Sequence, residues 1–524
     1  MNQLTDFKPL AKVTLPGVGD IPCSGLTLVV GPNSSGKTHL LSDLYLRLCG
    51  EPRKLVVASD VRINKPEFAP LMECLKSEGY IRTQMNPGNN QTQIIGNTTY
   101  IGTGASLQPI TPTQAEEWYH AYTHPTEGVD SGPRNEFLSY FGRLLVIKLF
   151  LDRRLIGFRT VNVIDFESQP PTDDLHAFHV NDSAREQLSA ETLDAFGKAV
   201  WSDSMRGTML CLRVCEGELP NPEDRLSFKR MSDYRTIESE GDGLKSYVAI
   251  CIALLLGQRP ICLIDEPEMC LHPPQAYSLG RFIGKHGSSK EIATFVATHS
   301  SQILRGVVQS TKDVEIMRLN RSSDQFVAHH VPADELVKAL GKPTLRAESV
   351  LDGIFSESVV VVEADGDRLV YNTTWETLSN ELRLDVHFAA VGGIGGIADT
   401  CKLYRTLHIP VVVMADLDMV VTSGQLRRVL DAMAEPQIAN SLVEKAELVI
   451  EQIRKLPPTI DPETYARRLA AIAGMRTDWQ CSDDEKIRRE LLKLCQTLDR
   501  MRRLKKWWYF CISRRDREAA GRAS

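Results

Sequence analysis

The chain of 524 residues is longer than the size at which one hydrophobic core stops growing, so roughly two to four domains are expected. Its 42% of apolar and 24% of charged residues are typical of a soluble globular protein and exclude a wholly disordered or fibrous chain. A net charge of −6 excludes a uniformly basic nucleic-acid-binding domain.

No apolar segment approaches the roughly 20 residues that cross a bilayer, the longest being Val248–Leu256. The first residues lack a basic stretch followed by an apolar one, so the sequence predicts a cytoplasmic protein without a membrane partner. The twelve cysteines lack the CxxC spacing of metal ligands, which indicates reduced thiols and no zinc site.

A glycine-rich loop joins a predicted strand, Leu26–Val30, to a predicted helix, His39–Cys49. Its spacing is G-x-x-x-x-G-K-T. In such a loop the backbone N–H groups surround phosphates, the lysine contacts the β- and γ-phosphate oxygens, and the threonine hydroxyl binds Mg²⁺. We therefore expect a Mg²⁺–ATP site formed by Gly31, Asn33, Ser34, Ser35, Gly36, Lys37 and Thr38.

Two polar stretches separate this loop from the next motif. The first, Pro87–Thr113, is rich in Asn, Gly and Thr, and the second, Ser168–Ser202, is polar throughout. We predict that one or both carry an inserted lobe, for example a dimerisation segment, within residues 60–235.

A second glycine-rich segment, Ser239-Glu-Gly-Asp-Gly243, opens a predicted helix, Leu244–Leu256, that Gly257 should end. The start of such a helix can bind an anion, so Ser239, Gly241 and Gly243 are candidate phosphate contacts. One chain offers no second nucleotide for them. The segment therefore favours two chains that pair head to tail.

Two further strands end in polar residues. The strand Pro260–Ile264 leads into Asp265 and Glu266, which we expect to hold Mg²⁺ and to act as the general base toward the attacking water. The strand Thr294–Ala297 leads to His299, which can sense the γ-phosphate.

In this order, the four motifs resemble the ABC ATPases of the Rad50, RecF and SMC type. The resemblance implies ATP hydrolysis and a nucleotide-linked dimer, in which the signature helix of one subunit completes the ATP site of the other. It also implies a Q-loop glutamine between Thr38 and Ser239, for which Gln93 is one of several candidates.

A second α/β pattern follows the segment Gly341–Pro343, and we place the domain boundary between residues 345 and 346. Strand Ser358–Val362 leads to Glu363 and Asp367. The pattern continues with the glycine-rich segment 391–396, a predicted helix, Ile397–Leu407, and the strand Pro410–Met414 with Asp416 and Asp418 after it.

Alternation along an extended chain puts Asp416 and Asp418 on one side, and Glu363 ends a neighbouring strand, so three carboxylates should converge. Their repulsion makes such a cluster costly unless a cation neutralises it. Oxygen ligands select Mg²⁺ or Mn²⁺, which can activate water for phosphodiester cleavage. The alternative is an ordinary α/β domain with acidic loop ends.

This second pattern resembles the Toprim domain of topoisomerases, primases and certain nucleases. A head of this kind followed by Toprim resembles the OLD (overcoming lysogenisation defect) ATP-dependent endonucleases, which include subunits of the Gabija and retron-linked anti-phage systems. The implied fold class is α/β: an ABC-type P-loop ATPase head with an inserted lobe in residues 1–345, then a Rossmann-like Toprim domain in residues 346–524.

The resemblance implies metal-dependent cutting of DNA, gated by ATP, in anti-phage defence, by a homodimer or a higher homo-oligomer. Glu363, Asp367, Asp416 and Asp418 would then hold the metal ions, and Lys505 or Lys506 would steady the scissile phosphate. A helicase, a reverse transcriptase or an RNA are possible defence partners that the sequence does not identify.

Two departures from the Toprim pattern bear on activity. Ala364 stands where a glycine usually follows the first glutamate. The stretch from Trp507 reads unlike its relatives, and a one-base shift of its back-translation can read Gly-Gly-Ile-Ser-Ala. A frameshifted tail and a genuine basic tail whose aromatic residues pack on the core are both open. Likewise, the basic cluster 467–522 is either a DNA-facing surface or a solvated helix face.

Two other functions stay open at this point. The first is an ATP-switched sensor or scaffold whose Toprim domain is degenerate and which signals to another protein. The second is a DNA-repair ATPase resembling RecF, which would not need the carboxylates Glu363, Asp416 and Asp418.

Overall fold

The computed structural model describes residues 8–77, 79–86, 88, 90–96, 108–124, 135–156, 158–167, 171, 173–206, 208–217, 234–257, 259–290, 292–322, 324–334, 336–337, 347–378, 385–416, 419, 423–454 and 509–513. Internal contacts divide the chain into two compact units, one of residues 1–30 and 34–333 and one of residues 31–33 and 334–524. The predicted boundary at 345/346 lies outside the described residues and stays a prediction.

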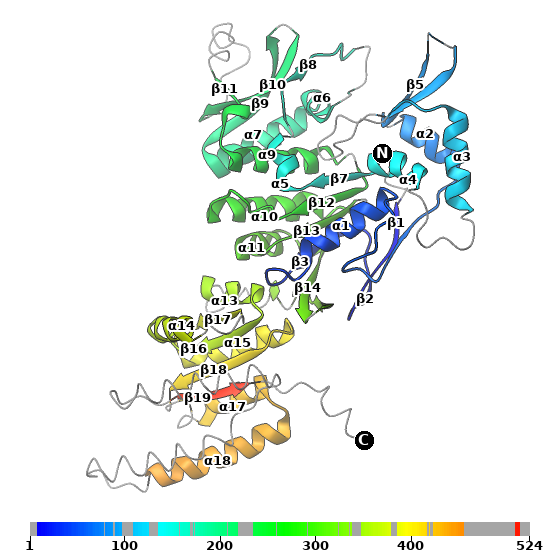
Figure 1. Cartoon of the computed structure of the whole chain (residues 1–524). Helices are drawn as coiled ribbons and strands as arrows, with labels where there is room; N and C mark the ends of the chain where they lie inside the picture. The colour runs from blue at the N-terminus through cyan, green and yellow to red at the C-terminus, as the bar shows by residue number, and fades with distance from the viewer. Residues whose placement is uncertain are drawn as a thin grey trace. The chain divides into compact units, whose positions relative to one another are not determined.

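The first unit is built on a six-stranded sheet with the order β15-β14-β3-β13-β12-β7 (Figure 1). Its strands are β3 (Gly25–Val30), β7 (Val146–Leu149), β12 (Ile261–Asp265), β13 (Ala293–Ala297), β14 (Val314–Ser322) and β15 (Gln325–Val331). All neighbours are parallel except β14 and β15. The carboxyl ends of β3, β12 and β13 therefore lie at one edge, where α/β proteins bind ligands.

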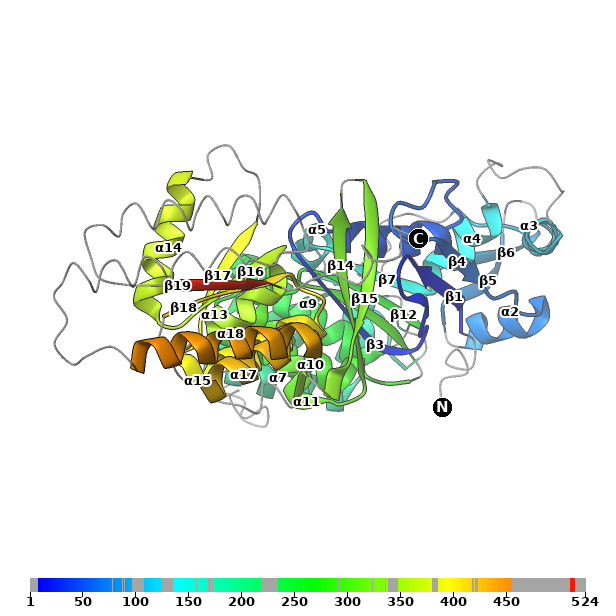
Figure 2. The same ribbon diagram turned by 90° about the horizontal axis from the view of Figure 1, so that it is seen from below.

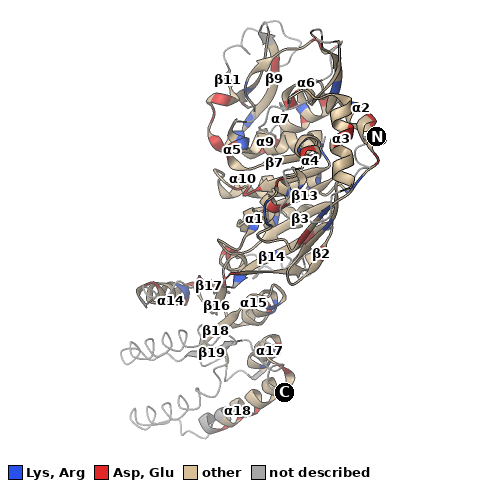
Figure 3. Cartoon of the chain, turned by 45° about the vertical axis from the view of Figure 1, so that its right-hand side comes forward, with Lys and Arg blue, Asp and Glu red and all other residues tan. Residues whose placement is uncertain are grey.

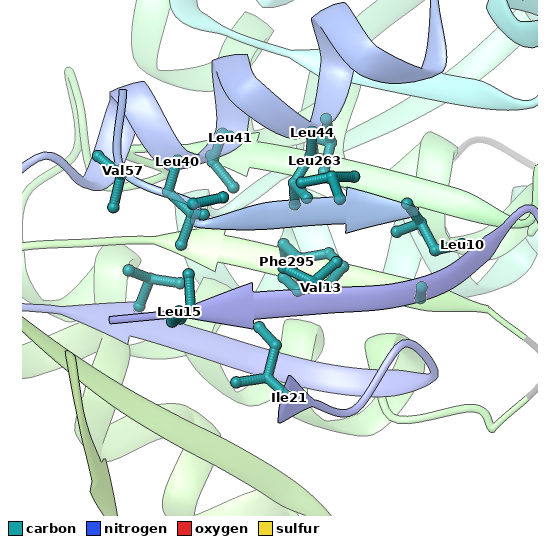
Figure 4. Close-up of a cluster of buried hydrophobic side chains, with 14 of the residues drawn as sticks. Leu10, Val13, Leu15, Ile21, Leu40, Leu41, Leu44, Val57, Leu263 and Phe295 are labelled. Carbon is teal, nitrogen blue, oxygen red and sulfur yellow. The ribbon is translucent and has the colours of Figure 1, made fainter. Parts of the chain in front are cut away.

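One face of this sheet packs against helix α1 (Lys37–Leu48) and against a small antiparallel sheet of β1 (Leu10–Leu15), β2 (Gly19–Ile21) and β4 (Asp60–Ile63). Figure 4 shows Leu40, Leu41 and Leu44 of α1 above Leu263 and Phe295 of the central strands. These α1 residues recur at helical spacing because one face of the helix is buried. The core thereby fixes the start of α1 at the carboxyl edge of the sheet.

Helices α9 (Asp242–Leu256), α10 (Pro273–Gly287) and α11 (Ser301–Ser310) follow the later motifs, and α10 and α11 pack on each other. Gly284 and Gly306 lie at this contact, where a Cβ on Gly306 would come within 2.3 Å of a backbone oxygen. Helix α9 ends at Gly257 in the left-handed conformation, as predicted.

Two groups of additional elements lie between α1 and α9. The first consists of α2 (Phe68–Ser77), the hairpin β5 (Ile81–Met85) and β6 (Thr92–Gly96), α3 (Pro112–Thr123) and α4 (Glu136–Phe141). It has an aromatic core of its own that includes Tyr122, Phe137 and Tyr140. The stretch predicted to be loop-like, Pro87–Thr113, thus contains β6.

The second group lies between α5 (Leu151–Ile156) and α9. It consists of β8 (Val161–Asn162), α6 (Asp174–His179), α7 (Asp182–Phe196), β9 (Lys198–Arg206), β10 (Met209–Glu216) and β11 (Arg235–Thr236). A buried ion pair between Arg213 and Asp203, 2.7 Å apart, joins β9 to β10. Both groups lie within residues 60–235, where one or two inserted lobes were predicted, and β7 between them belongs to the central sheet. The inserted lobe stays a prediction.

The second unit contains a sheet with the order β17-β16-β18-β19. Its strands are β16 (Ser358–Val362), β17 (Val386–Ala390), β18 (Val411–Asp416) and β19 (Tyr509–Ser513), and its helices include α13 (Glu348–Asp352), α14 (Asp365–Leu378), α15 (Ile394–Thr406), α17 (Ser423–Met433) and α18 (Pro436–Arg454). The first three strands are parallel, and β19 runs antiparallel to β18.

Figure 2 shows α14 on one side of this sheet and α15, α17 and α18 on the other. Tyr371 and Trp375 of α14 pack on Val360, Val362 and other residues that alternate along the three parallel strands. Because helices cover both faces, residues 359–362 of β16 are all valine and all buried. The α/β class predicted for both halves of the chain is confirmed.

Lys and Arg are interspersed with Asp and Glu over the first unit (Figure 3). The basic cluster predicted in residues 467–522 lies outside the described residues except for β19, whose side chains are not described. Among the helices that the structure describes, none is long and apolar enough to cross a membrane.

Candidate ATPase and Toprim sites

The P-loop follows β3 directly and turns through three residues with left-handed backbone conformations. Gly31, Ser34 and Gly36 have positive φ angles of 147°, 62° and 97°. A Cβ on Gly36 would lie 2.7 Å from the ring of Phe326 and 2.8 Å from a methyl carbon of Val57. Only glycine meets both the conformational and the spatial requirement there. Helix α1 begins directly after the loop, at Lys37. The backbone N–H groups of its first turn therefore lie at the loop, where phosphate groups bind in such folds.

Thr38 and Asp265, the two predicted Mg²⁺ ligands, contact each other. The Thr38 hydroxyl donates to the Asp265 carboxylate, with both oxygens at 3.0 Å. A hydroxyl and a carboxylate are oxygen donors that suit Mg²⁺. Lys37 is only 6% exposed, and burial lowers its pKa, while the carboxylates of Glu266, Glu268 and Asp265 oppose that change. The donor set therefore fits Mg²⁺–ATP.

Glu266 and His299 meet at the ends of β12 and β13. His299 Nδ1 lies 3.3 Å from Glu266 Oε1. This contact lowers the pKa of Glu266 and raises the pKa of His299. Glu266 itself has a φ of 45°, and its N–H donates to the Ala297 carbonyl at 2.8 Å. The geometry therefore presents an ionised carboxylate, as a general base requires, at the strand ends that also carry Asp265.

We predict that Asp265→Asn stabilises the nucleotide-free protein at neutral pH while it removes ATP hydrolysis. Burial raises the pKa of Asp265 to about 6 from 3.8. The folded protein therefore binds this proton more tightly than the unfolded chain does, and the group's contribution to stability is lost as the pH rises from 3.8 to about 6. Asparagine avoids that loss, which is on the order of 1–3 kcal/mol.

Thermal unfolding without metal or nucleotide measures this effect. The gain in unfolding temperature of Asp265→Asn over the wild type should be larger at about pH 7.5 than at about pH 5. A variant that is less stable than the wild type at the higher pH would show that the carboxylate is held favourably even without Mg²⁺.

Arg154, on α5, was not predicted. It is 1% exposed, and its guanidinium donates to the carbonyls of Leu149 at 2.9 Å, Asp265 at 2.5 Å and Glu266 at 2.9 Å. Burial lowers its pKa to about 10. It thereby fixes the backbone that carries both ATPase carboxylates. An arginine just after β7 could have been recognised as a site residue in the sequence only if β7 had been known to lie next to β12.

Glu268, also absent from the predicted site, lies beneath His299. Its carboxylate accepts hydrogen bonds from the Thr298 hydroxyl at 2.9 Å and from the His299 backbone N–H at 2.8 Å. Burial raises its pKa. A glutamate two residues after the predicted base was visible in the sequence, but nothing there indicated its contact with the end of another strand.

The predicted signature segment forms the start of α9. Gly241 is its N-cap, and Ser239 donates through its hydroxyl to the Thr236 carbonyl at 2.7 Å. Lys198 pairs with Glu240 at 2.7 Å, which ties the segment to β9. A Cβ on Gly243 would lie 2.5 Å from the backbone oxygen of Cys270, so only glycine fits there. A cavity of about 500 Å³ beside the segment is lined by Arg154, Leu155, Ile156, Phe158, Arg159, Thr160, Ile237, Glu238 and Lys245.

Gln93, one candidate for the Q-loop, lies on β6 and pairs with Gln84 of β5, in a hairpin separate from the central sheet. Between Thr38 and Ser239, the strand of the central sheet that pairs with β12 is β7. Residues 150–160, which follow β7, contain no glutamine that could be the Q-loop residue. The assignment of a Q-loop residue stays a prediction.

In the second unit, the strand register brings the backbones of two predicted metal ligands together. Val362 pairs with Met414, so Glu363 and Asp416 both lie at the carboxyl ends of adjacent parallel strands. The Gly393 N–H, in a segment where φ is positive at residues 392 and 393, donates to the Glu363 carbonyl at 2.8 Å. The glycine loop thus covers the same strand end.

Asp367 follows on the first turn of α14, where its carboxylate accepts from the Ala364 N–H at 3.2 Å, and burial raises its pKa. The side chain of Asp416 and the residues Asp418, Lys505 and Lys506 lie outside the described part of the chain. Within the described part, no group of three His, Cys, Asp or Glu residues is placed to hold a metal ion. The four-carboxylate set therefore stays a prediction.

The sheet, the P-loop and the strand-end residues Asp265, Glu266 and His299 define the first unit as a P-loop ATPase of the ABC type. Comparison with protein families agrees. A family model for an AAA domain, whose description names the AbiEii toxin of type IV toxin–antitoxin systems, matches residues 220–305. The Toprim-domain model of proteins like the overcoming lysogenization defect protein matches residues 354–418. The chain therefore combines an ATPase domain with an OLD-like Toprim domain, as predicted.

Solved structures with similarity include an SMC head bound to the C-winged helix domain of ScpA, at 13% identity over 63% of this chain and 99% of that one, with a TM-score of 0.32. The SMC head domain from Thermotoga maritima is also 13% identical, over 62% of this chain and 99% of that one, with a TM-score of 0.29. No curated protein matches the chain significantly.

Proposed function

We propose that the protein is an ATP-regulated DNA endonuclease that depends on Mg²⁺ or Mn²⁺ and acts as a homodimer or higher homo-oligomer. The observation that carries the proposal is the pairing of an ATPase domain with an OLD-like Toprim domain in one chain. ATPase and Toprim domains generally use ATP and divalent metal ions, and each unit presents carboxylates at the carboxyl edge of a parallel sheet.

On the ATPase side, Lys37 would bind the β- and γ-phosphates, and Thr38 and Asp265 would hold Mg²⁺, whose role would be to neutralise charge on the phosphates. Glu266 accepts the proton of the attacking water, and His299 contacts the γ-phosphate. The start of α9, at Ser239, Gly241 and Gly243, binds the nucleotide of a second subunit. Support for this last role comes from the start of α9, where Gly241 is the N-cap and makes no side-chain hydrogen bond to the first backbone N–H groups of the helix.

On the Toprim side, Glu363, Asp367, Asp416 and Asp418 would hold one or two divalent ions, whose chemistry would be to activate water and to stabilise the leaving oxygen. Lys505 or Lys506 steadies the scissile phosphate. The biological setting we propose is anti-phage defence, with DNA as the substrate. Its support is the likeness to OLD-type proteins.

One observation favours an alternative, an ATP-switched sensor whose Toprim domain does not cut. Asp367 already accepts a hydrogen bond from the Ala364 N–H, in a turn where Ala364 replaces the usual glycine. A carboxylate used to cap α14 has fewer lone pairs for a metal ion. In that case ATP binding would be signalled to another protein.

The test is to incubate the purified protein and its Asp416→Ala variant with supercoiled plasmid, with Mg²⁺ or Mn²⁺ and with or without ATP. We expect metal-dependent conversion to nicked or linear plasmid by the wild type alone. ATP hydrolysis without cutting under every condition would instead select the sensor. Cutting that persists in Asp416→Ala would assign the nuclease to another site or a contaminant.

A further inference from the structure

Glu268 is a buried carboxylate that joins two strand ends of the ATPase site. It follows β12, and its partners follow β13: the Thr298 hydroxyl, the His299 N–H and the His299 ring. Thr298 is itself fully buried, and its oxygen accepts from the Ser300 N–H at 3.0 Å. The short segment that carries His299 is therefore held by side-chain hydrogen bonds at consecutive residues.

The His299 ring lies between two glutamates. Its Nδ1 is 3.1 Å from Glu268 Oε1 and 3.3 Å from Glu266 Oε1. Both contacts use the same ring nitrogen, so neither glutamate uses Nε2. Two carboxylates on Nδ1 fix the orientation of the ring and require a proton on that nitrogen, as in sites where a carboxylate orients a catalytic histidine.

A purely structural link would not need a carboxylate at this position. Burying a charge costs free energy, and the raised pKa of the buried Glu268 carboxyl reflects that cost. A neutral side chain could bridge the two strand ends without that cost. The negative charge does have one specific use. It lets Glu268 accept a hydrogen bond from the protonated Nδ1 of His299, while Glu266 remains available to water.

We propose that Glu268 is a positioning residue of the ATPase site, which orients His299 so that Nδ1 faces both glutamates and Nε2 faces the terminal phosphate of ATP. This inference rests on the proposed roles of Glu266 and His299. Glu268 acts only through His299 and does not touch the nucleotide. Its removal should therefore have no further effect once the imidazole is absent.

The test is a double-mutant cycle of Glu268→Gln and His299→Ala in the full-length protein, measured as kcat for ATP. Each single substitution should lower kcat about 10- to 100-fold, the range for loss of a hydrogen bond to a charged group. The double variant should match His299→Ala within about twofold, because coupled residues are not additive. Additive losses, or a Glu268→Gln kcat equal to the wild type, would overturn the proposal.

Asp203→Asn is the matched control for stability. Asp203 is another buried acidic residue of the same unit, paired with Arg213 between β9 and β10. Its substitution should lower the unfolding temperature and leave kcat unchanged below that temperature. If Glu268→Gln does not fold, Glu268→Asp takes its place. Aspartate keeps the negative charge but is shorter by one methylene, which moves the carboxylate away from the His299 ring. The Glu268→Asp variant is then combined with His299→Ala in the same cycle.

A binding measurement separates this inference from the proposed hydrolysis. The ratio of the dissociation constants for ADP and ATPγS reports the contact with the terminal phosphate and needs no turnover. It should fall about tenfold in Glu268→Gln and in His299→Ala, and no further in the double variant. A wild type that binds ATPγS without hydrolysing ATP would contradict the ATPase proposal alone, whereas an unchanged ratio in Glu268→Gln would contradict the positioning role.

Discussion

Glu266→Gln should lower ATP turnover by about 100-fold or more while ATP remains bound. Glutamine has the size of glutamate and cannot accept the proton of the attacking water. The proposed Mg²⁺ ligands Thr38 and Asp265 are unchanged by this substitution, so nucleotide binding should be retained. Because the bound nucleotide persists, the variant should accumulate as the closed dimer. The measurements are steady-state phosphate release and the mass in solution with and without ATP.

Two variants give this prediction its controls. Lys37→Ala should lose nucleotide binding and stay in the ATP-free oligomeric state, because the lysine contact with the phosphates is removed. Glu315→Gln should behave as the wild type, since Glu315 belongs to an exposed Glu–His pair with His330, 2.7 Å apart, on β14 and β15. Unchanged turnover in Glu266→Gln would show that another residue is the base.

The ATPase site was predictable from sequence to the extent that each residue follows its own strand. The P-loop fixes its contacts through local spacing, and Asp265, Glu266 and His299 each lie one or two residues after an apolar run. Arg154 and Glu268 differ because their partners are distant in sequence: Arg154 bonds to carbonyls 111 and 112 residues away. Such contacts depend on which strands are neighbours, which periodicity alone does not give.

Element boundaries were predicted less well than element types. The predicted helix His39–Cys49 begins at Lys37 in the structure, because the P-loop lysine and threonine already have helical conformation. The helix predicted as Ile397–Leu407 begins at Ile394, inside the glycine-rich segment. Glycines favour a loop by propensity, but here they form the first turn of a helix packed on the sheet.

β19 shows a different limit of prediction. The sequence left the segment after Trp507 either frameshifted or a genuine tail, and the structure pairs Tyr509–Ser513 with β18 at the edge of the Toprim sheet. That pairing joins residues almost one hundred positions apart, so no local pattern indicates it. It gives residues 509–513 a place beside the strand that ends in Asp416, while the frameshift hypothesis stays untested.

Glu363→Ala should abolish metal-dependent nicking of plasmid and leave ATP hydrolysis within about twofold of the wild type. Glu363 follows β16, where its carboxylate would bind the divalent ion, and its loss would remove one oxygen ligand of the predicted carboxylate cluster. The ATPase carboxylates belong to the first unit, with its own sheet and core. The measurements are plasmid conversion over time with Mg²⁺ or Mn²⁺, and phosphate release from the same preparation.

Glu357→Ala is the matched control, because Glu357 is an exposed glutamate at the opposite, amino-terminal end of the same strand. If the loss of any glutamate next to β16 impaired cutting, Glu357→Ala and Glu363→Ala would have the same effect. We expect instead that Glu357→Ala still nicks the plasmid. A comparable loss of both activities in Glu363→Ala would contradict two separable sites, and it would mean that the Toprim carboxylates are needed to form the ATP-hydrolysing state itself. Retained nicking in Glu363→Ala would leave Asp416 and Asp418 as the ligands that suffice for cleavage.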